Sequence, residues 1–258
     1  MSEPASPQPT AGVLYLVATP IGNLEDITLR ALRVLKECDV VAAEDTRHSG
    51  RMLQHFGIAK PMLSYFQFNE AKRSEEIIAR LGRGEKVALV TDAGTPGISD
   101  PGERVVRAAL AAGFKVESIP GSCALVAALT ASGLPTEEFH FIGFLPHKSG
   151  QRRKQLEALG PVAGTLIFYE SPYRVAKLLT ELNEIFPTRP VVLARELTKL
   201  FEEYRRGTPG ELLAELERRP AKGEFVVLVG PAADSRCANE EGGRPGRSAS
   251  VSDAAMNA

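Results

Sequence analysis

Short apolar runs alternate with longer segments of helical periodicity along most of this chain. Residues 13–17, Val-Leu-Tyr-Leu-Val, have the length and composition of a buried strand. Ile27, Ala31, Val34 and Leu35 follow at the spacing of one face of a helix. Because strands that alternate with helices form parallel sheets with helices on their faces, the pattern predicts an α/β fold with a mostly parallel sheet.

The same pattern predicts a strand or a helix over most of residues 12–231, the expected folded part. Capping residues followed by Pro and Glu indicate helix starts at Asp100-Pro-Gly-Glu103 and Thr208-Pro-Gly-Glu211, and Ser171-Pro172 indicates another. The further expected strands are 40–42, 62–65, 87–91, 115–119, 139–143, 164–169, 190–195 and 225–229, and the further expected helices are 46–55, 70–81, 102–112, 123–131, 150–159, 172–185 and 209–217.

Two segments, residues 1–11 and 233–258, contain too few large apolar side chains to offset the entropy of ordering them. Both are expected to be disordered tails. The 258 residues include 31 Lys and Arg against 32 Asp and Glu, so the net charge is −1. Any contact with nucleic acid must therefore come from local clusters of charge.

The number and spacing of the cysteines favour a reducing compartment, and the hydropathy pattern gives no sign of export or of a membrane span. Cys38, Cys123 and Cys237 are widely spaced and odd in number, unlike a disulfide framework or a zinc site. The N-terminal residues lack the pattern of a secretory signal, and no apolar run nears the roughly 20 residues that a membrane-spanning helix needs. We therefore expect a cytoplasmic protein without a metal site or a membrane contact.

Small residues gather where three expected strands end, at 18–23, 92–102 and 120–122. Ligands of open α/β sheets bind at the carboxyl ends of strands, and glycine lets backbone approach a ligand closely. Each loop alone could equally be a plain turn. The loop 92–102 is longer than a turn needs, and it predicts a cofactor cleft. Neither the dinucleotide motif G-x-G-x-x-G nor the P-loop motif is present.

Charged residues occur at the same strand ends. Glu44, Glu170 and Glu196 each lie at or just after the end of an apolar strand, where ligands of such sheets bind. The run Arg152-Arg153-Lys154 lies instead at the start of an expected helix. We expect this run to be a solvated surface.

The chain carries six ordered motifs between about Gly12 and Gly230. They are Ala18-Thr-Pro-Ile-Gly-Asn-Leu-Glu-Asp-Ile-Thr28, Ala43-Glu-Asp-Thr-Arg47, residues 92–102, Pro120-Gly-Ser122, Tyr169-Glu-Ser-Pro-Tyr-Arg174 and Arg195-Glu-Leu-Thr-Lys199. In this order they resemble the ribosomal RNA small subunit methyltransferase I group, a branch of the tetrapyrrole (corrin and porphyrin) methylases. Thr95 takes the place of the Asp in the Gly-Asp-Pro segment of porphyrin-methylating relatives, a departure of this branch.

The resemblance implies two α/β domains, expected at 12–121 and 122–232, with S-adenosyl-L-methionine in the cleft between them. It also implies a homodimer. The implied reaction is methylation of a cytidine ribose at its 2′-oxygen, in the decoding centre of 16S rRNA. The near-neutral charge favours a substrate that is already assembled into the small ribosomal subunit.

Site residues follow from these motifs as hypotheses. Glu170, Asp45 and Lys199 are candidates for the general base, together with Glu44, and Lys199 qualifies only if burial lowers its pKa. Arg47, Arg174 and Lys199 are expected to contact RNA phosphates. The residues expected to bind the cofactor are Asp92, Ala93, Gly94, Thr95, Ile98, Ser99, Gly121, Ser122, Ala124, Tyr169 and Glu196.

Two other functions remain open. The first keeps the fold and methylates carbon in a porphyrin or corrin; Thr95 and the motifs at 43–47 and 169–174 argue against it. The second is an RNA-binding or assembly factor of the same fold without catalysis. Binding of S-adenosyl-L-methionine separates this second function from an enzyme.

Overall fold

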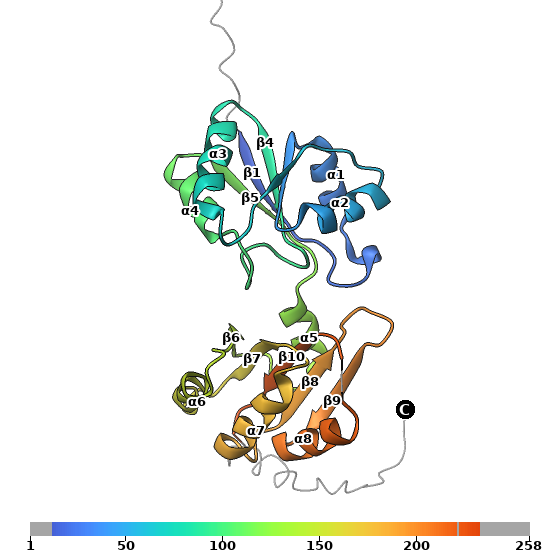
Figure 1. The fold of residues 1–258 in the computed structure, drawn as a ribbon, viewed down its shortest axis with the longest axis vertical. Coiled ribbons are helices and arrows are strands. Elements are labelled where there is room, and N and C mark those ends of the chain that lie inside the picture. The colour runs from blue at the N-terminus through green and yellow to red at the C-terminus, as the bar shows by residue number, and fades with distance from the viewer. Residues whose placement is uncertain (1–11, 221, 233–258) are drawn as a thin grey trace, which may run out of the picture.

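A computed structural model describes residues 12–220 and 222–232. The predicted tails 1–11 and 233–258 lie outside the described residues. Figure 1 shows two α/β units, one built on the first half of the chain and the other on the second half. Each unit contains one five-stranded sheet. The predicted α/β class is confirmed, and the domain limits 12–121 and 122–232 stay a prediction.

The first sheet is entirely parallel, in the order β3-β2-β4-β1-β5. Helices α1 and α2 cover one face, and α3 and α4 cover the other (Figure 1). The elements are β1 (Val13–Val17), η1 (Leu24–Asp26), α1 (Leu29–Glu37), β2 (Val40–Ala43), α2 (Thr46–His55), β3 (Met62–Ser64), α3 (Glu70–Gly82), β4 (Lys86–Val90), α4 (Glu103–Ala111) and β5 (Lys115–Ile119).

Burial on both faces explains the continuous apolar runs of these strands. In β4, Val87 and Leu89 pack with α3 and α4, whereas Ala88 and Val90 pack with α1 and α2. Because all five strands are parallel, their carboxyl ends share one edge of the sheet. The loops that follow β1, β4 and β5 therefore meet there.

The second sheet is mixed, in the order β6-β7-β10-β8-β9. Helices α6, α7 and α8 pack on one face and α5 packs on the other. The elements are α5 (Ala124–Ser132), β6 (Phe139–Phe144), α6 (Ser149–Ala158), β7 (Thr165–Glu170), α7 (Val175–Ile185), β8 (Val191–Arg195), β9 (Glu203–Gly207), α8 (Pro209–Arg218) and β10 (Phe225–Val229).

The prediction of a mostly parallel sheet is wrong for this second half. Only β6 and β7 pair in parallel, since β10 lies antiparallel between β7 and β8, and β9 is antiparallel to β8. Strand β9 was not predicted. Because β7 and β8 run opposite to β10, and β6 runs parallel to β7, the carboxyl ends of β6, β7 and β8 lie at the edge of the sheet where β10 begins.

Three local predictions have different outcomes. Thr208 and Glu211 form the expected capping box: Glu211 Oε2 accepts from the Thr208 N–H at 2.7 Å. Asp100 does not cap α4, because the helix begins at Glu103 with Gly102 as its N-cap. Arg152 is buried rather than solvated, with 5% of its surface exposed.

Candidate active site

A cavity of about 400 Å³ lies between the carboxyl edge of the first sheet and the facing edge of the second. This volume is within the range of small-molecule sites. Much of its lining is apolar, with Ile21, Ile98, Phe144, Leu197 and Val226 among the contributing residues. The polar groups include three carboxylates, Asp100 from the first half of the chain and Glu170 and Glu224 from the second. The cavity thus has the form of a site for an amphipathic cofactor.

Backbone contacts join the loops at the end of the first sheet. Thr19 and Gly94 exchange hydrogen bonds of 2.9 and 3.0 Å, and the Thr95 hydroxyl donates to the Ser122 carbonyl at 3.1 Å. Gly94 has φ of +83°, a conformation that favours glycine. The loops after β1, β4 and β5 therefore form one wall of the cavity.

The loop after β4 also reaches the second sheet. Ser99 has φ of +61°, and its hydroxyl lies over Gly143, where a bulge interrupts the pairing of β6 with β7. A Cβ at Gly143 would lie 2.9 Å from Ser99 Oγ, too close for an ordinary contact. Glycine at this position lets the two halves approach each other beside the cavity.

Tyr169 connects β7 to the start of α5. Its hydroxyl accepts a hydrogen bond from the Leu125 N–H at 3.1 Å, and burial raises the pKa of the phenol. The N-cap residue Cys123 makes no side-chain hydrogen bond to the helix, and Ala124 lines the cavity. The positive end of this helix is thus directed at the cavity, where it would favour an anionic group.

Asp100 was missed as a site residue, because its sequence context was interpreted as a helix cap. In the structure it lines the cavity. Burial raises the pKa of its carboxyl to about 7, and the charges of Glu44 and Asp92 act in the same direction. The sequence signal for Asp100 is its place in the loop 92–102, which is predicted to form a cofactor cleft. The capping interpretation gives this second Asp of the loop no role in that cleft.

Glu170 lies at the cavity end of β7, with 3% of its surface exposed. Oε1 accepts from the Ser171 N–H at 2.8 Å and lies 3.3 Å from Arg174 Nε. Oε2 is buried and has no hydrogen-bond partner among the described residues. Burial raises the pKa of this carboxyl, although Arg174 and Arg152 oppose the increase. A carboxylate with one free oxygen and a raised pKa can accept a proton.

Asp45 is a weaker base. It caps α2, and hydrogen bonds from Arg47 lower the pKa of its carboxyl to about 2. The Arg47 side chain is 87% exposed, and one of its guanidinium nitrogens lies 2.9 Å from Asp45 Oδ2. Neither Asp45 nor Arg47 lines the cavity.

The structure does not meet the condition under which Lys199 is expected to act as a base, namely a lowered pKa. Burial would lower the pKa of its ammonium, but hydrogen bonds to Glu196 and Glu224, each of 3.0 Å, raise it. Lys199 is therefore a cation held by two carboxylates. The loop that carries it is strained, because Glu196 and Thr198 have φ of +51° and +65°.

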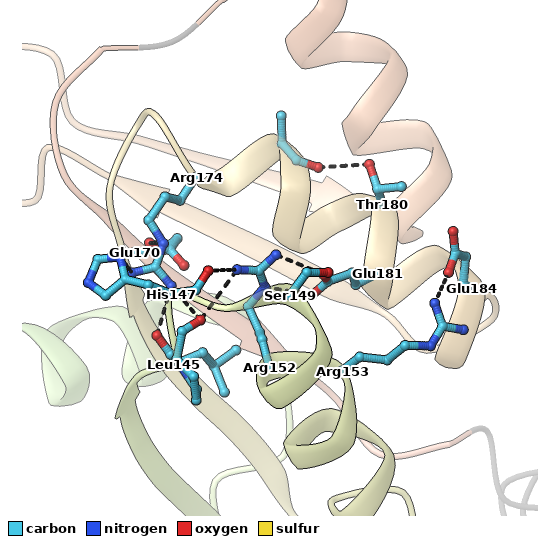
Figure 2. Close-up of polar contacts among 12 residues, drawn as sticks. Leu145, His147, Ser149, Arg152, Arg153, Glu170, Arg174, Thr180, Glu181 and Glu184 are labelled. Carbon is cyan, nitrogen blue, oxygen red and sulfur yellow. Dashed lines mark hydrogen bonds and ion pairs between the residues drawn. The ribbon is translucent and has the colours of Figure 1, made fainter.

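Arg174, expected to contact RNA phosphates, makes contacts within the protein instead. Only 17% of its side chain is exposed. Its Nη2 donates to the Leu145 carbonyl at 2.8 Å, and its Nη1 lies 3.4 Å from His147 Nδ1 (Figure 2). Its Nε lies within ion-pair distance of Glu170 but makes no hydrogen bond among the described residues.

The structure brings most of the predicted cofactor residues together. Those in the cavity wall are Ala93, Gly94, Thr95, Ile98, Ser99, Ala124 and Tyr169. Asp92, Gly121, Ser122 and Glu196 do not line the cavity. Asp92 Oδ1, for example, accepts from the Asp45 N–H at 3.1 Å. Besides Asp100, the residues missed by the sequence analysis are Ile21, Cys123, Phe144, Ser171, Pro172, Ala194, Leu197, Glu224, Phe225 and Val226.

The described part of the chain contains neither a metal-binding cluster nor a membrane-spanning helix. No group of three or more His, Cys, Asp or Glu side chains there has the geometry to hold a metal ion. None of the helices in that part is both long and apolar enough to cross a membrane.

Known proteins resemble this chain over most of its length. Residues 13–213 match the family model described as Tetrapyrrole (Corrin/Porphyrin) Methylases. Ribosomal RNA small subunit methyltransferase I of Halalkalibacterium halodurans is 51% identical over 218 residues, which are 84% of this chain and 75% of that protein. The protein of the same name from Pseudomonas aeruginosa is 52% identical over 223 residues, covering 85% of this chain and 79% of that protein.

A solved structure supports the same architecture. The uroporphyrin-III-C-methyltransferase from Thermus thermophilus superposes with a TM-score of 0.61 at 27% sequence identity. The superposition covers 85% of this chain and 94% of that one. The arrangement of two α/β units therefore recurs in a methyltransferase.

Proposed function

Because this chain belongs to the tetrapyrrole methylase family, and within it to the ribosomal RNA small subunit methyltransferase I group, we propose that it methylates small-subunit ribosomal RNA with S-adenosyl-L-methionine. The observation that carries the proposal is identity of about 50% over most of the chain to proteins of that name. The cavity between the two sheets is the proposed site of the reaction.

The cavity suits the chemical groups of this cofactor. A carboxylate at Asp100 would favour a cation, and the N-terminus of α5 at Ala124 would favour the carboxylate of an amino acid. Ile21, Ile98 and Leu197 offer apolar surface for an adenosine. The cofactor would supply an electrophilic methyl group on a sulfonium. The residues around it bind and orient the two reactants, and alignment alone can contribute about 7 to 11 kcal/mol.

The finer proposal is methyl transfer to the 2′-oxygen of a cytidine ribose in the decoding centre of 16S rRNA. As the new O–C bond forms and the S–C bond breaks, the hydroxyl proton must leave. Glu170 Oε2 is the proposed acceptor, because it has no hydrogen-bond partner among the described residues and belongs to a buried residue that lines the cavity. Asp45, with its low pKa, is the weaker candidate.

Contacts with RNA phosphates are proposed for Arg47, whose side chain is largely exposed at the start of α2, just after the carboxyl end of β2. Phosphate contacts position a substrate without reading its sequence.

We also propose a homodimer, a cytoplasmic location and a substrate within the small ribosomal subunit. They rest on the family and on the net charge of −1.

Transfer of label from radioactive S-adenosyl-L-methionine tests the function. The purified full-length protein is incubated with assembled small subunits, with protein-free 16S rRNA and with uroporphyrinogen. We expect alkali-stable label in the rRNA of the subunits and much less in protein-free RNA, since few phosphate contacts hold naked RNA weakly. Label in the porphyrin alone would identify a carbon methylase, and binding of subunits without transfer would identify an assembly factor.

A further inference from the structure

Two guanidinium groups hold the turn between β6 and α6 (Figure 2). Arg174 Nη2 donates to the carbonyls of Leu145 and Pro146, at 2.8 and 3.4 Å. Arg152 Nη1 donates to the carbonyls of Pro146 and His147, at 3.3 and 3.2 Å. Three successive carbonyls are thus bound by arginines from two different helical segments.

Arg152 is itself fixed from the far side. Its Nε and Nη2 form a two-pronged pair with the Glu181 carboxylate, at 2.6 and 2.7 Å, and Ser149 donates to the same carboxylate at 2.7 Å. The two side chains of the ion pair are 6% and 9% exposed. A buried pair with this geometry leaves Arg152 little freedom, so the turn that it binds is firmly anchored.

Arg174 connects this turn to the carboxylate of Glu170. Its Nε lies 3.3 Å from Glu170 Oε1, while its Nη2 holds the carbonyl of Leu145, the residue that follows the cavity residue Phe144. The Ser171 N–H binds Oε1 as well. One oxygen of Glu170 is therefore held from two sides, and the other is left without a partner among the described residues.

We propose that Arg174 is a positioning residue for methyl transfer, which orients Glu170 so that Oε2 faces the substrate hydroxyl, and which ties that carboxylate to the turn after Phe144. The proposal rests on the proposed function. It replaces the phosphate contact that the sequence suggested for Arg174. The proton that leaves the hydroxyl goes to Oε2, while Oε1 keeps its two contacts.

The charges that face Glu170 determine how its titration should respond. Burial raises the pKa of its carboxyl, and Arg174, Arg152 and His147 lower it. Removal of Arg174 takes away a lowering cause, so the pKa of Glu170 should rise further. Because the base acts in its deprotonated form, the acidic limb of the rate profile should then move to higher pH.

Single-turnover methyl transfer measured against pH tests this role. In Arg174→Gln we expect the acidic limb to move up by about one pH unit, the usual size of an arginine's effect on a neighbouring carboxylate. Arg174→Lys keeps the charge and should shift it less. Glu170→Gln should slow transfer about 100-fold, within the usual contribution of a general base. Arg153→Gln is the matched control, since that exposed arginine pairs with Glu157 and Glu184.

Two results would overturn the proposal. One is an acidic limb that stays in place in Arg174→Gln. The other is a slope of subunit binding against salt that falls by about one in the same variant, which is the signature of a lost phosphate contact. If the wild-type protein transfers no methyl group at all, the proposed function fails. The pKa of Glu170, followed by carboxyl ¹³C NMR in wild type and Arg174→Gln, then tests the positioning role by itself.

Discussion

The carboxyl group of Asp100 lies in the cavity wall, where burial and the charges of Glu44 and Asp92 raise its pKa to about 7. A carboxylic acid that ionises near neutral pH destabilises the fold once it is charged. The same charge would favour a cationic ligand beside it. The Asp100 carboxylate therefore lowers the free energy of unfolding but would strengthen binding of a cation, a combination that is common at functional sites.

Asp100→Asn tests this combination. The folded pKa lies above the ordinary value of 3.8, so the unfolded chain ionises first and the wild type loses stability as pH rises from about 4 to about 7. We expect the Tm difference between the variant and wild type, followed by circular dichroism, to grow over this range and to stay constant above it. Calorimetry at pH 8 should show weaker binding of S-adenosyl-L-methionine by the variant. Equal Tm profiles in the two proteins would contradict the assignment.

At the scale of secondary-structure elements, the bulge in β6 determines how closely the loop after β4 approaches the second sheet. Gly143 has φ of +71°, and any Cβ there would collide with Ser99 Oγ. A residue with a Cβ at position 143 would therefore incur two costs: a left-handed backbone conformation and a close contact with Ser99 beside the cavity.

Gly143→Ala separates these costs when it is compared with Gly133→Ala. Gly133 also has a positive φ, of +81°, but a Cβ there meets nothing within 4 Å. Both variants should lose about 1 to 2 kcal/mol of unfolding free energy in urea, the usual cost of a left-handed residue with a side chain. Only Gly143→Ala should also weaken binding of S-adenosyl-L-methionine in calorimetry. Equal affinities in the two variants would show that the Ser99 contact does not shape the site.

The elements that could be predicted are those with an apolar pattern. The direction of a strand could not be predicted, because a buried strand such as β10 is an unbroken apolar run in either direction. Strand β9, Glu-Tyr-Arg-Arg-Gly, was missed because it pairs only with β8 at the sheet edge, where charged residues are common.

The candidate site was predictable to the extent that it follows strand ends. The loop 92–102 and the position of Glu170 were found in this way. The roles of Lys199 and Arg174 were not, because each also binds a partner that is distant in sequence: Glu224 for the first and Leu145 for the second. A charged side chain at a strand end can either face a ligand or bind its own protein, and sequence spacing does not distinguish the two.

At the scale of the whole molecule, the two sheets belong to separate halves that face each other (Figure 1). Carboxylates from both halves line the cavity between them, among them Asp100 from the first half and Glu170 from the second. In the proposed function, Asp100 favours the cation of the cofactor and Glu170 accepts the proton, while both halves of the chain contribute to the cofactor site. The net charge of −1 gives no general attraction to RNA, so recognition must depend on local contacts such as Arg47.

A mass-spectrometric map of ribose methylation in 16S rRNA, from cells with and without the gene, tests the central claim most directly. We predict that one 2′-O-methylcytidine of the decoding centre disappears when the gene is deleted. The wild-type gene should restore it, and a gene encoding Glu170→Gln should restore it poorly. An unchanged map after deletion would contradict the proposed function.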